Sequence, residues 1–63
     1  MLHNLQKRLN ALQLLAMSNS MGNEWDKANT RIALARQTQS AKLKIEWYVE
    51  AQIMVDELDA RLT

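Results

Sequence analysis

The sequence predicts an all-α fold, an antiparallel helical hairpin with a short first helix and a long second helix. Good helix formers, chiefly Leu, Ala, Gln, Lys, Arg, Glu and Met, dominate the composition. Proline is absent, and there is only one glycine. Apolar residues recur at intervals of three or four through most of the chain, which is typical of amphipathic helices. The 63 residues form a single domain at most.

The first helix is expected over residues 2–19. Its apolar residues are spaced alternately by three and four, so they share one face of a helix. They are Leu2, Leu5, Leu9, Leu12 and Ala16. A turn is expected over residues 20–23, because Gly22 can adopt the left-handed conformation that ends a helix. Asn23 can then cap the next helix, and Glu24 and Asp26 lie in its first turn, where the helix dipole favours carboxylates.

The second helix is expected over residues 24–62, since no glycine or proline interrupts this stretch. Its apolar series repeats every 3.7 residues, closer to an eleven-residue repeat than to a heptad, which predicts straight or slightly right-handed packing. Thr38 and Ser40 are weak helix formers and mark the expected place for a bend. The members of the series are Trp25, Ala28, Ile32, Ala35, Gln39, Leu43, Trp47, Ala51, Met54, Leu58 and Leu62.

A β-strand is the alternative for residues 42–56. Apolar and polar side chains nearly alternate from Leu43 to Val55, as they do in a half-buried strand. Tyr48 and Met54 break this alternation, no turn residues bound the segment, and a single strand has no pairing partner in this chain. We therefore favour the helix.

The length of the second helix predicts association with other chains. A chain of this size removes only about 60% of its unfolded surface from water. There is no cysteine, and His3 is the only histidine, so neither disulfides nor a metal site are expected to reinforce the fold. At about 1.5 Å per residue, the second helix is roughly 30 Å longer than the first. In the expected hairpin, residues 42–62 have no cover from their own chain.

Residues 43–62 carry apolar side chains on two separate faces of the predicted helix. One face includes Leu58, and the other consists of Ile45, Val49 and Ile53. A helix with two apolar faces lies between two neighbours. This predicts a helical bundle or coiled coil formed by oligomerisation, or a place in a larger assembly. The expected partner-binding residues are Leu43, Ile45, Trp47, Tyr48, Val49, Ile53, Met54, Val55, Leu58 and Leu62.

Charge is unevenly distributed, although the net charge is only +1. Residues 1–44 carry seven basic and two acidic residues, whereas residues 45–63 carry one basic and five acidic residues. The basic part of one chain can therefore meet the acidic end of another. A basic stripe on the second helix is also typical of phosphate binding, so a nucleic-acid-binding helical dimer is the first alternative function. Its candidate contacts are Lys27, Arg31, Arg36 and Lys42.

The sequence carries no catalytic, cofactor-binding or metal-binding signature. His3 has no second histidine, cysteine or neighbouring carboxylate to act with. Asp56, Glu57 and Asp59 form an acidic cluster, which we interpret as a solvated helix end. Glu57 and Arg61 have the spacing of an i, i+4 ion pair on a helix. We therefore expect a protein that is not an enzyme and uses no cofactor.

The expected function is a non-enzymatic protein–protein interaction or assembly module, either a homo-oligomer or a small subunit of a larger complex or virus-like particle. A peripheral membrane helix is the second alternative, with the leucine face of the first helix on the lipid. No apolar stretch reaches the roughly 18 residues that a membrane span needs. The first 23 residues lack acidic side chains, but their interrupted apolar stretch is a poor signal core. The expected location is the cytoplasm or a particle assembled there.

Overall fold

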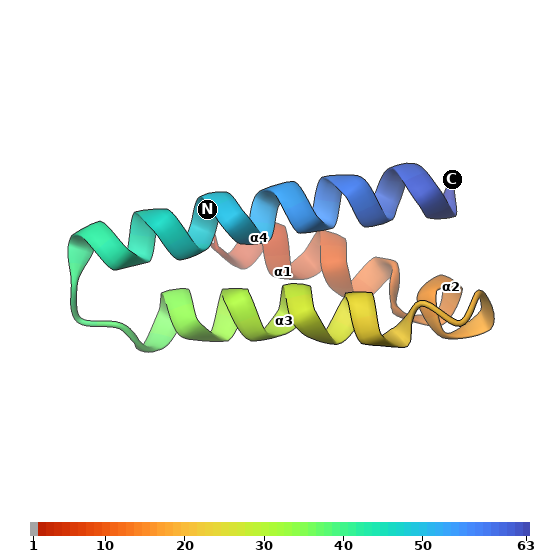
Figure 1. Ribbon diagram of the computed structural model, residues 1–63, viewed down its shortest axis with the longest axis horizontal. Helices are drawn as coiled ribbons and strands as arrows, with labels where there is room; N and C mark the ends of the chain where they lie inside the picture. The colour runs from red at the N-terminus through yellow and green to blue at the C-terminus, as the bar shows by residue number, and fades with distance from the viewer. Residues whose placement is uncertain (1) are drawn as a thin grey trace.

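The computed structural model describes residues 2–63, which form four helices joined by short connections (Figure 1). They are α1 (Leu2–Ala11), α2 (Gln13–Ser18), α3 (Gly22–Gln37) and α4 (Ala41–Leu62). These residues include no strand. The all-α prediction is therefore confirmed, and the strand alternative for residues 42–56 is wrong.

Figure 1 shows α3 and α4 lying antiparallel along the molecule, with α1 packed behind them and α2 at the end where α3 begins. The molecule measures 35 × 16 × 15 Å. α4 has 22 residues and extends over nearly all of the long dimension. α1 has only 10 residues, and its residues Asn4 and Leu5 line a depression together with Tyr48 and Gln52 of α4. The first turns of α4 therefore extend beyond α1.

The expected first helix is divided at Leu12 into α1 and α2. Leu12 has φ −90° and ψ −4°. Its N–H donates to the Leu9 carbonyl at 3.0 Å, which is the tightened turn of a helix end. The Leu9 carbonyl also accepts a 2.6 Å hydrogen bond from the indole Nε1–H of Trp25. Trp25 therefore ties the end of α1 to α3.

The reversal between α2 and α3 occupies residues 19–21. Ser20 takes the left-handed conformation, with φ 59°. The Met21 N–H donates to the Ala16 carbonyl at 2.7 Å, and the Ser20 N–H donates to the Met17 carbonyl at 3.3 Å. These two bonds are those of the Schellman motif, which satisfies the free carbonyls at a helix end. These local hydrogen bonds therefore accompany the end of α2 and the turn of the chain.

A reversal at this place was expected, but Gly22 and Asn23 have other roles than predicted. Gly22 is the first residue of α3, and its φ is not positive. Asn23 lies within the helix, and the N-cap residue, Met21, has no side-chain capping bond. The left-handed position therefore falls two residues before the glycine. Glu24 does lie in the first turn of α3, as predicted, whereas Asp26 lies beyond that turn.

The prediction of a continuous helix over residues 24–62 is wrong, because the chain leaves the helical conformation at Thr38 and resumes it at Ala41. Thr38 and Ser40 are extended, with ψ of 140° and 120°. The Ser40 N–H donates to Thr38 Oγ1 at 3.2 Å, and Ser40 Oγ accepts from the Leu43 N–H at 3.2 Å. Short hydroxyl side chains compete with helical backbone bonds in this way. The predicted bend is therefore a complete reversal.

This reversal brings α4 back along α3, and both helices meet α1 in one core. Its buried members are Leu5, Leu9, Leu12, Ala28, Ile32, Ala51, Val55 and Leu58. Removing apolar surface from water favours this folding back over an extended arm. The prediction that residues 42–62 have no cover from their own chain is therefore wrong.

Candidate interaction surface

Six of the ten predicted partner-binding residues contribute to the protein's own fold. Val55 and Leu58 are buried in the core, and the other four are partly buried. The six are Trp47, Tyr48, Met54, Val55, Leu58 and Leu62. These side chains pack against other helices of their own chain. The expected hairpin left them without such cover.

Three of the remaining four form an exposed apolar row on α4, which we call the outer stripe: Ile45, Val49 and Ile53. Their exposed fractions are 61%, 48% and 52%, respectively. Residues four apart are offset by about 40° around a helix, so the stripe occupies one side of α4. The buried Ala51 and Leu58 lie about 160° and 180° from Val49 around the same axis. The outer stripe therefore faces away from the core.

Polar side chains flank the outer stripe on α4. Lys42 and Glu46 lie near its first half, and Gln52 and Asp56 lie near its second half; all four are exposed. An apolar centre with a polar, solvated rim is the usual anatomy of a protein–protein contact. The stripe and its flanks therefore have the composition of a small interface.

Leu43, the fourth exposed residue of the predicted set, lies on the side of α4 that carries Trp47, about 120° from Val49. Arg31 of α3 spans the two helices on that side. Its guanidinium lies 5.5 Å from the centroid of the Trp47 ring, and its Nε donates to Glu50 Oε1 at 3.0 Å. Leu43 therefore borders a surface that the chain's own charged pair occupies.

Sequence reasoning did not identify a second exposed apolar group, on α2. Its members are Leu14, Leu15 and Met17. The available signal was the density of apolar residues: five of the six residues from Leu12 to Met17 are apolar, which is more than one face of a helix can bury. α2 has only 6 residues, so this group is short.

The four candidate nucleic-acid contacts do not form one stripe. The reversal at residues 38–40 places Lys42 on a different helix from Lys27 and Arg31, so the stripe predicted on a continuous helix is corrected. Arg31 is bound to Glu50. Arg36 is exposed in the last turn of α3.

Arg8 ties α1 to the acidic end of α4. Its Nη2 lies 2.7 Å from Asp56 Oδ1 and 3.7 Å from Asp59 Oδ2. The hydrogen bond to Asp56 raises the pKa of Arg8 above its ordinary value. Two of the acidic residues interpreted as a solvated helix end therefore have a basic partner within the same chain.

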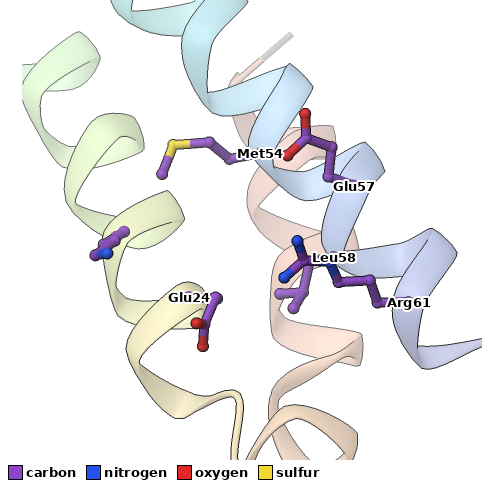
Figure 2. A pocket seen from close by; sticks show the side chains of 6 residues that line it. Glu24, Met54, Glu57, Leu58 and Arg61 are labelled. Carbon is purple, nitrogen blue, oxygen red and sulfur yellow. The ribbon is translucent and has the colours of Figure 1, made fainter.

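Two shallow depressions lie between helices of the described residues. One lies between α3 and α4, where Figure 2 shows Glu24 opposite Met54, Leu58 and Arg61. It encloses about 70 Å³, and the depression beside Tyr48 encloses about 210 Å³. Sites for small molecules usually enclose about 300–1,000 Å³. The remaining functional candidates are therefore the outer stripe and the exposed apolar group on α2.

Three further observations bear on function. In residues 2–63, no three potential metal ligands lie close enough together to hold an ion. Within the same range, no helix combines the length and apolar character needed to cross a membrane. The leucines proposed to face lipid pack into the core instead, three of them buried and Leu2 partly buried.

No protein-family model matches the chain, and no curated protein or solved structure matches it.

Proposed function

We propose that this chain is a non-enzymatic protein–protein interaction module that contacts another protein chain through the outer stripe. The observation that carries the proposal is the exposure of three aligned aliphatic side chains on the longest helix after the chain has folded. Single exposed apolar residues are common on protein surfaces. Three at a constant spacing of four give a continuous apolar row, which supports a contact.

The residue types in the stripe support the same conclusion. Isoleucine and valine are β-branched and lose side-chain freedom in a helix, so they are poorer helix formers than Lys, Glu or Ala. At exposed positions that contribute little to the core, the polar helix formers would favour the fold and solubility more. Ile45, Val49 and Ile53 therefore have a use outside the fold of the single chain.

α4 presents the stripe on a rigid element. Its opposite side is buried against α3 and α1, and ion pairs with Arg8 and Arg31 hold it at two further points. A surface that is already ordered loses little conformational entropy on binding. Burying a large aliphatic side chain contributes about 1.5–3 kcal/mol, and about half of that surface remains exposed here.

Site-specific photo-cross-linking in the cells that make the protein tests this proposal. A benzophenone amino acid replaces Val49 in one variant and Lys7, which is exposed on α1, in the control. We expect protein adducts at position 49 that are absent at position 7. Equal adducts at both positions, or none at position 49, would contradict the proposal.

A further inference from the structure

We infer that the partner of the outer stripe is a second copy of this chain, packed antiparallel along α4 with a two-fold axis beside Val49. This inference rests on the proposed function and adds the occupant and its orientation. Its basis is the order of residues on both sides of Val49.

The apolar residues are symmetric about Val49. Ile45 precedes it by four residues, and Ile53 follows it by four. In an antiparallel pair centred on Val49, each Ile45 lies level with Ile53 of the other copy, and the two Val49 side chains meet at the axis. A two-fold interface requires such a self-complementary surface. In this arrangement, each apolar residue of the outer stripe therefore faces an apolar residue of the other copy.

The charged residues on the same side are also arranged about Val49, with opposite signs. Lys42 precedes it by seven residues and Asp56 follows it by seven, so each is offset by only about 20° from Val49 around the helix. Both side chains are exposed. In the antiparallel pair, Lys42 of each copy lies level with Asp56 of the other. A parallel pair would place Lys42 against Lys42 and Asp56 against Asp56, which charge repulsion opposes.

The bond that Asp56 already makes is compatible with this contact. Arg8 uses Asp56 Oδ1, at 2.7 Å. A carboxylate accepts several hydrogen bonds, and Oδ2 is the second acceptor atom. Asp56 can therefore accept from Lys42 of a second copy while it remains paired with Arg8.

Glu46 and Gln52 form a third pair of positions about Val49. Glu46 precedes Val49 by three residues, and Gln52 follows it by three. They lie about 60° from Val49 on opposite sides of the helix, so they border the contact without meeting across it. The apolar positions are compatible with the antiparallel orientation, and Lys42 and Asp56 are the residues that favour it.

Cysteine cross-linking of the purified chain tests the inference, because the chain has no native cysteine. The variants are Ile45→Cys and Ile53→Cys, oxidised separately and as a mixture. We expect a mixed 45–53 disulfide dimer as the main product of the mixture and little dimer from either variant alone. Lys44→Cys, on a different side of α4, is the matched control and should give little dimer with any of them. Self-cross-linking of each single variant as efficient as the mixed product would overturn the antiparallel arrangement.

Charge reversal provides a second readout. Lys42→Glu should weaken self-association about fivefold or more, and this effect should shrink as salt is added. Lys44→Glu makes the same change of charge in the same region of α4 and should alter the dissociation constant less than about twofold. An equal effect of the two substitutions would contradict the pairing of Lys42 with Asp56. Circular dichroism of each variant checks that the fold is retained.

The outcomes separate this inference from the proposed function. If the purified chain stays monomeric up to about 1 mM while position 49 forms adducts with a different protein in cells, the second copy is the wrong occupant and the interaction module stands. If position 49 forms no specific adducts, the proposed function itself is wrong. A dimer that cross-links in the parallel pattern overturns only the orientation.

Discussion

At the scale of single residues, the turn between α2 and α3 depends on the left-handed conformation of Ser20. An L-residue other than glycine pays a conformational penalty there, of about 1 kcal/mol. Two residues later, Gly22 occupies a helical position, where glycine is the less favourable choice. A Cβ atom added to Gly22 would meet no other atom within 4 Å. The glycine therefore lies where it is not needed, and the strained position lacks it.

Placing glycine at position 20 and alanine at position 22 should stabilise the protein. The double variant Ser20→Gly, Gly22→Ala removes the left-handed penalty and adds a better helix former at the start of α3. We expect the free energy of unfolding to rise by about 1 kcal/mol, measured by urea or thermal denaturation followed by circular dichroism. A decrease would show that the turn does not depend on the backbone conformation of Ser20.

The position of this turn could be predicted from the sequence, but its residue could not. Gly22 and Asn23 carry the general preferences of helix ends, and those preferences placed the reversal within one or two residues. The hydrogen bonds that accompany the left-handed conformation of Ser20 are accepted by the Met17 carbonyl from Ser20 N–H and by the Ala16 carbonyl from Met21 N–H. They depend on where α2 ends, which residue preferences alone do not determine.

At the scale of helices, the reversal at residues 38–40 decides the architecture. The weak helix formers Thr38 and Ser40 marked the place for a bend, yet Gln39 continues the helical spacing of the apolar series. The residue preferences at positions 38–40 were therefore nearly balanced between continuing and ending the helix. Tertiary packing decided between a bend and a reversal, because folding back buries Ile32 of α3 in one core with Val55 of α4.

Ser40 should be the residue that most favours the start of α4. Its hydroxyl oxygen accepts a hydrogen bond from the Leu43 N–H as an N-cap. Ser40→Ala should lower the free energy of unfolding by about 1 kcal/mol, whereas Ser40→Asp, which can form the same cap, should retain it. Chemical denaturation of the three proteins provides the comparison. Equal losses for the alanine and aspartate variants would exclude a capping role.

Of the two apolar faces predicted for residues 43–62, the one that includes Leu58 is buried and the outer stripe is exposed. This difference is testable. Leu58 is buried in the core, so Leu58→Asp places a carboxylate in an apolar site and should unfold the chain. Val49 is half-exposed on the outer stripe, so Val49→Asp should retain nearly full helix content. Circular dichroism of the two variants under the same conditions distinguishes the faces. Similar unfolding by both would mean that the outer stripe belongs to the core.

Part of the candidate surface was predictable at this scale. The spacing of Ile45, Val49 and Ile53 placed them on a face separate from Leu58, and that separation is present in the structure. Periodicity alone could not show that Val55 and Leu58 are buried within their own chain instead of against a partner. A helical pattern shows which residues share a face, but not whether that face is covered by the same chain.

At the scale of the whole molecule, the segregation of charge along the sequence helps to close the bundle. The basic first part and the acidic last part meet within one chain, through Arg8 with Asp56 and through Arg31 with Glu50. Exposed ion pairs of this kind contribute little each, typically below about 1 kcal/mol. Their effect is to favour the registration of α1 and α3 against α4 over other arrangements.

The unequal lengths of the helices also act at this scale. α1 is too short to cover all of α4, and α4 has one side against α1 and α3 and one side in solvent (Figure 1). By folding back, the single chain thus buries the apolar residues of its core. The outer stripe remains exposed, as do Leu43 and the apolar group on α2. The order of residues about Val49 in the stripe favours a second copy of the same chain.

Sedimentation equilibrium of the wild-type chain and Val49→Asp, from about 10 µM to 1 mM, tests this central claim most directly. We predict that the wild-type mass rises with concentration from 7.3 kDa towards twice that value, while the variant stays folded at 7.3 kDa. A wild-type chain that remains at 7.3 kDa throughout, or a variant that dimerises equally well, would contradict it.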